Sequence, residues 1–536
     1  MFELDFLKVR RLANQQVIAA NQTRWYSPLS FMNISMRQTP SPDLPTVPED
    51  EYKTPLGSNT TLVSNDTEAY TEQVGTIVIN SREVGRRALR PQPSLDPNDP
   101  LNWSSWQKYS TYLTVCFFTF LATANASKFT VAVIPLSKEF KKSNFEIGYL
   151  VCFNILFLGV GNIFWVPLMR IIGKRPVFLI SLPILAVTNV WAARTHNFNS
   201  LLASQIASGF AGAAAEASVP AVAADLFFVH QRGTVLMMFH MALSFGAFLG
   251  PLINSYVVPC GATWIVSIFI VHESSYYKRD VNAPFDSYPS KKTFIQKLSL
   301  TNGYNKDTSF LQALWNTIRV LAYPPVLWTG LTVGVFVGWG ITVQLTSSRT
   351  FVQPPYNYKA SFLGFICISG FIGTLIALFF GGKLIDVISN RVTKAHYGVR
   401  EPEYRLYAFI IPAIVGPMGI LLFGLTISEH RPWLEPAVGY AMDAFGLIAV
   451  NNVLVTYAVD SYLPLAGEVL VVTFVMRGVI GTVLALYSVK WMENVGQKNF
   501  FGMMVGVEYF MCAWVILFLI YGKRIRARTA RYGPMV

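Results

Sequence analysis

Long apolar runs constrain the fold of this chain more than any other feature. A helix of about 20 predominantly apolar residues crosses the hydrocarbon core of a bilayer, and such runs recur from residue 109 onward. The composition agrees, because 14% of the residues are charged, whereas soluble domains carry about 25%. We therefore predict an all-α polytopic membrane protein. The predicted spans are 109–134, 146–168, 176–194, 200–225, 233–257, a weak one at 261–272, and then 325–346, 361–380, 406–428, 434–458, 468–488 and 500–522.

Polar segments divide these spans into two predicted bundles. Residues 1–106 are rich in Pro, Ser, Thr and Asn and lack a long apolar run, which predicts a disordered tail. Lys and Arg are concentrated in alternate loops and in the tails, and the positive-inside rule places those segments in the cytoplasm. We expect spans 1–6 within 107–272, a cytoplasmic loop at 273–324, spans 7–12 within 325–522, and a basic cytoplasmic tail at 523–536. The plasma membrane is the expected location, with the vacuolar membrane as the alternative.

The net charge of +13 does not indicate nucleic-acid binding, because the basic residues lie mostly between apolar runs. The chain has neither a P-loop, which disfavours ATP-driven transport, nor the GxSxG and HExxH patterns of hydrolases. The five cysteines form no CxxC pair, and the histidines are dispersed. We predict no enzymatic activity, no cofactor and no metal. The expected partners are a small-molecule substrate, protons and the lipid bilayer, and the expected state is a monomer.

Charged residues inside the apolar runs are the main candidates for function. A carboxylate at the bilayer centre costs about 2.5–3.5 kcal/mol on insertion scales, so it usually faces a cavity and has a task. Glu216, within the small-residue run that starts at Gly209, is the leading acid, as proton acceptor, cation site or structural hydrogen-bond partner. Asp443 is a weaker analogue in span ten. Lys128 and Arg477 are cations that could pair with an acid across a cavity, and Asn154, Gln344 and Asn451 are further candidates for its lining.

Several motifs in order resemble those of fungal major facilitators of the drug:proton antiporter group with twelve spans. The sequence LDPNDPLNWSSW, 95–106, resembles the segment that precedes the first span of that group. DLFFVHQRG at 225–233 resembles the turn after the fourth span, and GVREPEYRL at 398–406 resembles a loop of the second half. Asp460-Ser461-Tyr462 and Ala466-Gly467-Glu468 match the turn between spans ten and eleven. The resemblance implies two pseudo-symmetric six-helix bundles with a substrate site between them near the midplane.

The antiporter motif of span five, Gly246-x-x-x-Gly250-Pro251, suggests a gating element. Paired glycines let another helix approach closely, and proline bends a helix. The alternative is simple helix packing. Charged groups near the predicted cytoplasmic surface could form latches that hold one conformation closed, or could merely set topology. The candidates are Asp225 and Arg232 with Gly173, Lys174 and Arg175 in the first half, and Gly382, Asp386 and Arg391 in the second.

The chain also departs from the family pattern. Arg170 occupies the slot where many members carry an acid in the loop between spans two and three, and Gln205 replaces an arginine of span four. From Thr234 to His272 the chain is too short for two full spans and a turn. A truncated sixth span, caused by a missing internal piece or by degeneration of the copy, is the interpretation we favour.

The predicted function follows from the resemblance. It is proton-coupled efflux of a small organic compound, such as a drug, toxin or secondary metabolite, by alternating access. Two alternatives remain open. One is a facilitator that imports a nutrient or a polyamine, and the other is a membrane protein that does not transport.

Overall fold

The computed structural model describes most of the chain beyond residue 92. The described residues are 77–78, 93–94, 96–130, 132–228, 231–252, 257–275, 292, 296, 299, 309–354, 356–358, 362–396, 399–462 and 465–532. Contacts divide the chain into Met1–Leu62 and Val63–Val536, and every described residue lies in the second unit. The predicted disordered tail therefore lies largely outside the described residues.

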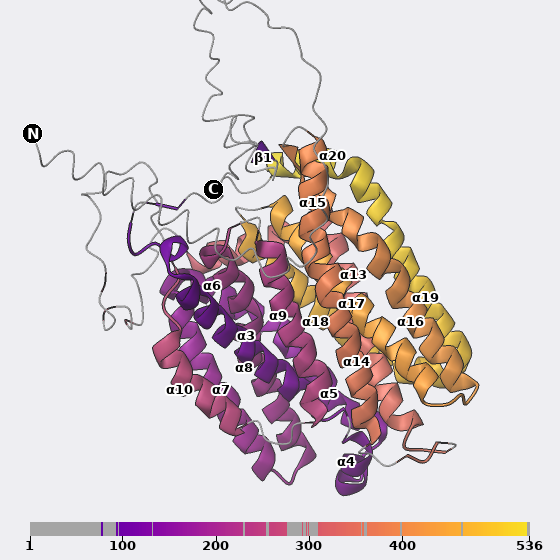
Figure 1. Cartoon of the computed structure of the whole chain (residues 1–536). Coiled ribbons are helices and arrows are strands. Elements are labelled where there is room, and N and C mark those ends of the chain that lie inside the picture. The colour runs from indigo at the N-terminus through magenta and orange to yellow at the C-terminus, as the bar shows by residue number, and fades with distance from the viewer. Residues whose placement is uncertain are drawn as a thin grey trace, which may run out of the picture. The chain divides into compact units, whose positions relative to one another are not determined.

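A first group of helices, in indigo to magenta, occupies one side of Figure 1. A short 3-10 turn, η2 (Pro100–Asn102), leads into it. The helices are α3 (Ser105–Ser127), α4 (Val133–Phe140), α5 (Asn144–Val160), α6 (Asn162–Ile172), α7 (Lys174–Arg194), α8 (Phe198–Leu226), α9 (Arg232–Leu249) and α10 (Val257–Ile270), with the 3-10 turn η3 (Gly250–Leu252) after α9.

A second group, in salmon to yellow, lies beside the first (Figure 1). It comprises α12 (Phe310–Leu321), α13 (Pro324–Thr350), α14 (Leu363–Leu378), the π-helical turn η6 (Phe379–Lys383), α15 (Leu384–Ala395), the 3-10 segment η7 (Pro402–Phe409), α16 (Ile410–Ser428), α17 (Leu434–Ser461), α18 (Ala466–Val495), α19 (Gln497–Ala513) and α20 (Val515–Tyr532). One short antiparallel pair joins β1 (Ile77–Val78) to β2 (Val399–Arg400).

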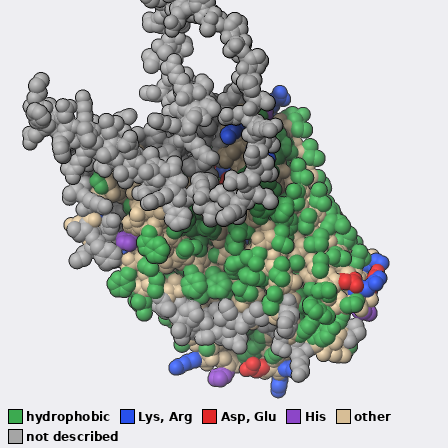
Figure 2. Space-filling view, in the orientation of Figure 1, with side chains coloured by type: hydrophobic (Ala, Val, Ile, Leu, Met, Phe, Trp, Pro, Cys, Tyr) green, Lys and Arg blue, Asp and Glu red, His purple; other side chains and the backbone are tan. Residues whose placement is uncertain are grey.

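The helices carry the marks of membrane spans. Nine in the described part of the chain are long and apolar enough to cross a bilayer, and Gly233–Leu249 is a shorter apolar helix. Figure 2 shows hydrophobic side chains over the flank of the helices, with charged side chains towards the ends. Val187, Ile414 and Ile520 are among the large apolar side chains that are exposed. Because lipid replaces water along that flank, exposed apolar groups carry no penalty there. The all-α polytopic prediction is confirmed.

The most extensive contacts between the two groups are those of α5 with α18 and of α9 with α14. Gly159 and Gly478 face each other across the first pair, and a Cβ atom on Gly159 would lie 2.7 Å from the Phe474 carbonyl oxygen. Phe245 packs on Phe371 across the second pair, with ring centroids 4.6 Å apart. Small residues at the crossing let the backbones approach closely, as expected for packing in a membrane.

The sixth predicted span is the short helix α10. Its 14 residues reach about 21 Å at 1.5 Å per residue, less than the hydrocarbon thickness of about 30 Å. Its final turn is nevertheless held by two hydrogen bonds. Arg175 donates to the Ile268 carbonyl at 2.7 Å, and Thr111 donates to that of Ile270 at 3.1 Å. A missing internal piece stays a prediction, and residues 253–256 lie outside the described residues.

Gly246 of α9 lies so close to α3 that there is no room for a side chain. A Cβ atom there would collide with Thr123 Oγ1 and lie 2.6 Å from the Phe120 carbonyl oxygen. We expect Gly246→Leu to lower the free energy of unfolding by roughly 1–3 kcal/mol, because overpacking must displace one helix. Gly506→Leu is the matched control, since nothing lies within 4 Å of a Cβ atom at that position. Thermal unfolding in detergent measures both, and equal melting temperatures would contradict the close contact.

Candidate functional site

A cavity lies between the two groups of helices. Its volume is about 120 Å³, and α3, α5, α8 and α9 line one side while α13, α17 and α18 line the other. Most lining residues are apolar. The polar groups are Glu216, Arg477, Thr123, Ser127, Ser244, Gln344 and Asn451. Pockets for drug-sized ligands measure about 300–1,000 Å³, so the two groups would have to separate to admit such a molecule.

An ion pair joins the two groups of helices at this cavity. Glu216 of α8 accepts a hydrogen bond from the Arg477 guanidinium of α18 through its Oε1 atom. The Glu216 side chain is fully buried and that of Arg477 is 7% exposed. Among the described residues, the second carboxylate oxygen, Oε2, has no hydrogen-bond partner. The sequence prediction that an intramembrane cation pairs with an acid fits this arrangement.

His240 of α9 lies within electrostatic range of Arg477 but is missing from our sequence predictions. It is fully buried, and neither ring nitrogen has a hydrogen-bond partner in the described part of the chain. The sequence contained a signal for it, because His240, like Glu216, is an ionisable residue inside an apolar run. Phe239 packs against the ring, with centroids 4.9 Å apart.

The other predicted cavity residues divide into two classes. Gln344 and Asn451 line the cavity. Asn154 does not, because its amide donates to the Gln205 carbonyl at 2.8 Å inside the first group of helices. Asp443 is buried at 1% exposure within the second group and is also absent from the cavity lining. Lys128 donates to the side chains of Asn125 and Asn189 at the end of α3.

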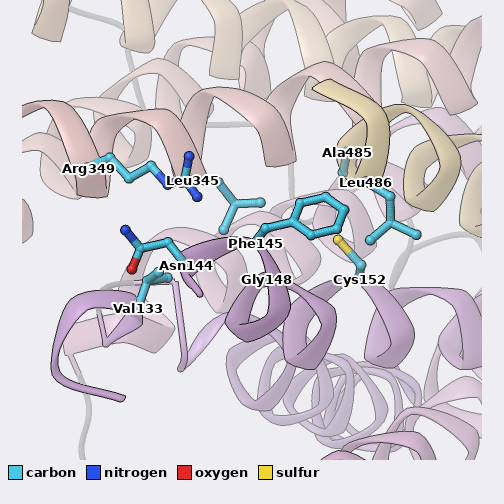
Figure 3. A pocket seen from close by; sticks show the side chains of 9 residues that line it. All are labelled: Val133, Asn144, Phe145, Gly148, Cys152, Leu345, Arg349, Ala485 and Leu486. Carbon is cyan, nitrogen blue, oxygen red and sulfur yellow. The ribbon is translucent and has the colours of Figure 1, made fainter. Parts of the chain in front are cut away.

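Figure 3 shows a second and smaller cavity between the groups, near α4. Its volume is about 20 Å³, and Phe145, Leu345 and Leu486 give it an apolar character. Arg349 and Asn144 are its polar side chains. This space suits at most one water, so the larger cavity remains the candidate site.

A second link between the groups lies at the end where α15 is found, called here the α15 end. Arg170 of α6 forms a bidentate ion pair with Glu468 in the first turn of α18, with Nη2 2.6 Å from Oε2. The Glu468 side chain is 3% exposed. Arg170 occupies the position where the family pattern has an acid. In this chain the acid of the pair is Glu468 of α18.

Asp386 of α15 makes the corresponding link in the second half. Its Oδ2 atom accepts hydrogen bonds from the Thr234 amide and hydroxyl, both at 3.1 Å, at the start of α9. A carboxylate is favourable there because a helix N-terminus presents free N–H groups and partial positive charge. A Cβ atom on Gly233 would collide with Asp386 Oδ1, which explains the glycine of the DLFFVHQRG turn.

The remaining predicted latch residues have mainly local contacts. Lys174 and Asp225 pair within the first group of helices. Gly173 has a φ of +98°, and Glu273 accepts hydrogen bonds from the Lys174 and Arg175 amides that follow. Gly382 lies against Met237 of α9, and Arg391 is exposed. In the span-five motif, Pro251 is half-buried, and a Cβ atom on Gly250 would lie 2.6 Å from Ser127 Oγ. The side chain of Arg232 is outside the described residues.

The GVREPEYRL loop ties three segments together. Glu401 and Glu403 hold the fully buried Arg526 of α20, and Arg405 pairs with Asp460 of α17 at 2.7 Å. Burial acts to raise the pKa of the Glu401 carboxyl, but hydrogen bonds from Lys523 and Arg526 outweigh it and leave that pKa below its usual value.

Comparison with known proteins decides the family. The sequence model of the Major Facilitator Superfamily matches residues 115–486. The chain belongs to the Major Facilitator Superfamily. The chain is 24% identical to protein HOL1 of Saccharomyces cerevisiae, with 83% of this chain and 91% of HOL1 covered. It is 25% identical to the MFS-type transporter penM of Penicillium rubens, with 89% and 98% covered.

Other similarities agree with this membership. The efflux pump radE of Floropilus chiversii is 22% identical, with 81% of this chain and 83% of radE covered. The solved structure of the proton:xylose symporter XylE matches with a TM-score of 0.55 at 13% identity, covering 78% of this chain and 97% of XylE. That structure supports the major facilitator fold. In the described part of the chain, no group of His, Cys, Asp or Glu residues could hold a metal ion.

The Arg170–Glu468 pair yields a charge-swap prediction. We expect Arg170→Glu to separate the two bundles at the α15 end, because two carboxylates would then face each other. Spin labels at Gln231 and Lys394, both exposed, should report a longer distance in this variant. Adding Glu468→Arg should restore the original distance, whereas Asp225→Asn, which breaks a pair within one bundle, should leave it unchanged. A double variant as displaced as the single one would contradict the latch.

Proposed function

We propose that this chain is a secondary active transporter that exports a small organic compound in exchange for protons. The Glu216–Arg477 ion pair carries the proposal, because it joins the bundles and borders the cavity where a substrate would bind. A carboxylate can take up a proton, and a proton on Glu216 would remove the charge that holds Arg477. One binding event would then weaken the link between the bundles.

The proposed cycle uses differential affinity for two conformations. A proton arriving from outside neutralises Glu216, and the bundles rearrange so that the cavity faces the cytoplasm. Substrate binding there favours release of the proton, the ion pair forms again, and the cavity returns to the outside. Such coupling requires only that proton and substrate prefer different conformations. We place the α15 end in the cytoplasm with both termini, so Arg170–Glu468 and Asp386–Thr234 would close the cytoplasmic side.

The lining of the cavity favours a neutral amphipathic substrate. Its one acid and one base among the described lining residues compensate each other, and the rest is apolar with a few hydroxyl and amide groups. A polyamine importer would need surplus negative charge at this site, so we rank it second. The names of relatives such as the efflux pump radE also support export. We further propose a monomer in the plasma membrane, with the vacuolar membrane as the alternative.

Export assays with Glu216→Gln test this proposal. Cells that lack their own efflux pumps would be loaded with the neutral dye Nile red, and dye loss would be followed with and without a proton gradient. We expect the wild-type chain to accelerate loss only with the gradient, and Glu216→Gln to abolish this acceleration. Glu435→Gln, an exposed acid at the start of α17, is the control and should export normally.

Uptake of radiolabelled spermidine in the same cells separates the alternatives. Gradient-dependent spermidine accumulation without dye loss would replace export by polyamine import. If a correctly folded chain shows no dye loss and no spermidine uptake, the transport proposal is overturned for these two classes of probe. That result would favour the non-transporting alternative. Wild-type levels of gradient-driven export in Glu216→Gln would remove Glu216 from the coupling step.

A further inference from the structure

Two carboxylic acids are buried inside the second bundle, away from the central cavity. Asp443 of α17 is 1% exposed and Glu508 of α19 is fully buried. Neither lines the cavity that Glu216 borders. Glu508 is absent from our sequence predictions, although it is a single acid inside the last apolar run. The mechanism proposed above uses neither residue.

These two acids lie within electrostatic range of each other. The helices α17 and α19 that carry them both pack on α16. Unlike Glu216, neither acid forms an ion pair with a cation in the described part of the chain. Tyr440 lies within electrostatic range of Asp443, and Tyr509 and Cys512 lie within range of Glu508.

The hydrogen-bond inventory of the pair is also incomplete. Both carboxylate oxygens of Glu508 and Oδ1 of Asp443 have no partner among the described residues. An ionised carboxylate without a counter-ion or donors is very costly in an apolar interior, and two such groups near each other also repel. Binding a proton is the cheapest way to remove this cost.

We propose that Asp443 and Glu508 together form a proton-binding site inside the second bundle, distinct from the Glu216–Arg477 pair. At neutral pH at least one of the two carboxyl groups keeps its proton, because no cation or donor in the described part of the chain offsets the cost of its charge. Gln344 lines the cavity, and Tyr440, three residues before Asp443 on α17, lies within electrostatic range of that acid. Proton binding here does not require transport, but its use in coupling rests on the proposed function.

Infrared difference spectroscopy tests the site directly. Full-length protein in lipid nanodiscs would be titrated from acidic to alkaline pH, and the C=O stretch of protonated carboxylic acids would be followed. We expect a band that persists at neutral pH in the wild-type chain and is lost in Glu508→Gln or in Asp443→Asn. The band should survive in Glu216→Gln and in Glu139→Gln, whose carboxylate is exposed. A band unchanged in both Glu508→Gln and Asp443→Asn would overturn the proposal.

Thermal unfolding provides a second readout that a merely structural role would not move. A folded chain that holds a proton which the unfolded chain releases is most stable at low pH and loses stability as pH rises. We expect this decline in the wild-type chain and a flatter profile in Glu508→Gln, because its neutral amide replaces a neutral acid of the same shape. An equally steep profile in Glu508→Gln and Asp443→Asn would count against the site.

The two proposals can fail separately. If the chain exports no dye but the infrared band is present and lost in Glu508→Gln, the proton site stands and its role in efflux falls. If export is driven by the proton gradient while the band is unaffected by either variant, the site is wrong and Glu216 remains the coupling candidate.

Discussion

The ion pair between Glu216 and Arg477 is the interaction on which the relation of the two bundles depends. Moving two charges out of water is expensive, and the pair offsets that cost only while both partners are charged and in contact. Removing one charge leaves the other buried and uncompensated, which typically costs about 3–5 kcal/mol. A pair that joins two rigid bundles therefore converts a local change of charge into a force on their relative position. The central cavity borders this pair, which is why the proposed mechanism lets a substrate and a proton act on the same link.

The two groups of helices are linked at the α15 end by two different kinds of contact. Asp386 accepts hydrogen bonds from the first residues of α9, so a carboxylate meets the positive end of a helix. The side chain of Arg170, a residue of α6, lies against the N-terminus of α18. The partial positive charge of that helix end would repel a cation. Glu468 in the first turn of α18 compensates for it. The departure of Arg170 from the family pattern is thus a change of partner that keeps the two bundles linked.

Sequence reasoning could identify the spans because hydrophobic length is a local property. It also identified Glu216 and Arg477 as unusual, and the short sixth span agrees with the 14-residue helix α10. It could not assign Glu216 to Arg477, because those residues are 261 positions apart and only the packing of α8 against the second bundle brings them together. Asn154 was expected in the cavity, yet its amide satisfies the backbone of α8. The direction in which an amide points depends on helix rotation, which an apolar run does not encode.

Glu216, Asp443 and Glu508 show why a lone acid in an apolar run is an ambiguous signal. All three give the same pattern in the sequence, and all three are buried to within 1% of full burial. Their surroundings separate them, because Glu216 has a guanidinium partner, whereas neither Asp443 nor Glu508 forms an ion pair in the described part of the chain. A paired carboxylate is stable as an anion and responds to anything that competes for its cation. An unpaired one is stable only with a proton. The same residue type in the same kind of helix therefore supports two opposite charge states, and the neighbouring side chain determines which one is present.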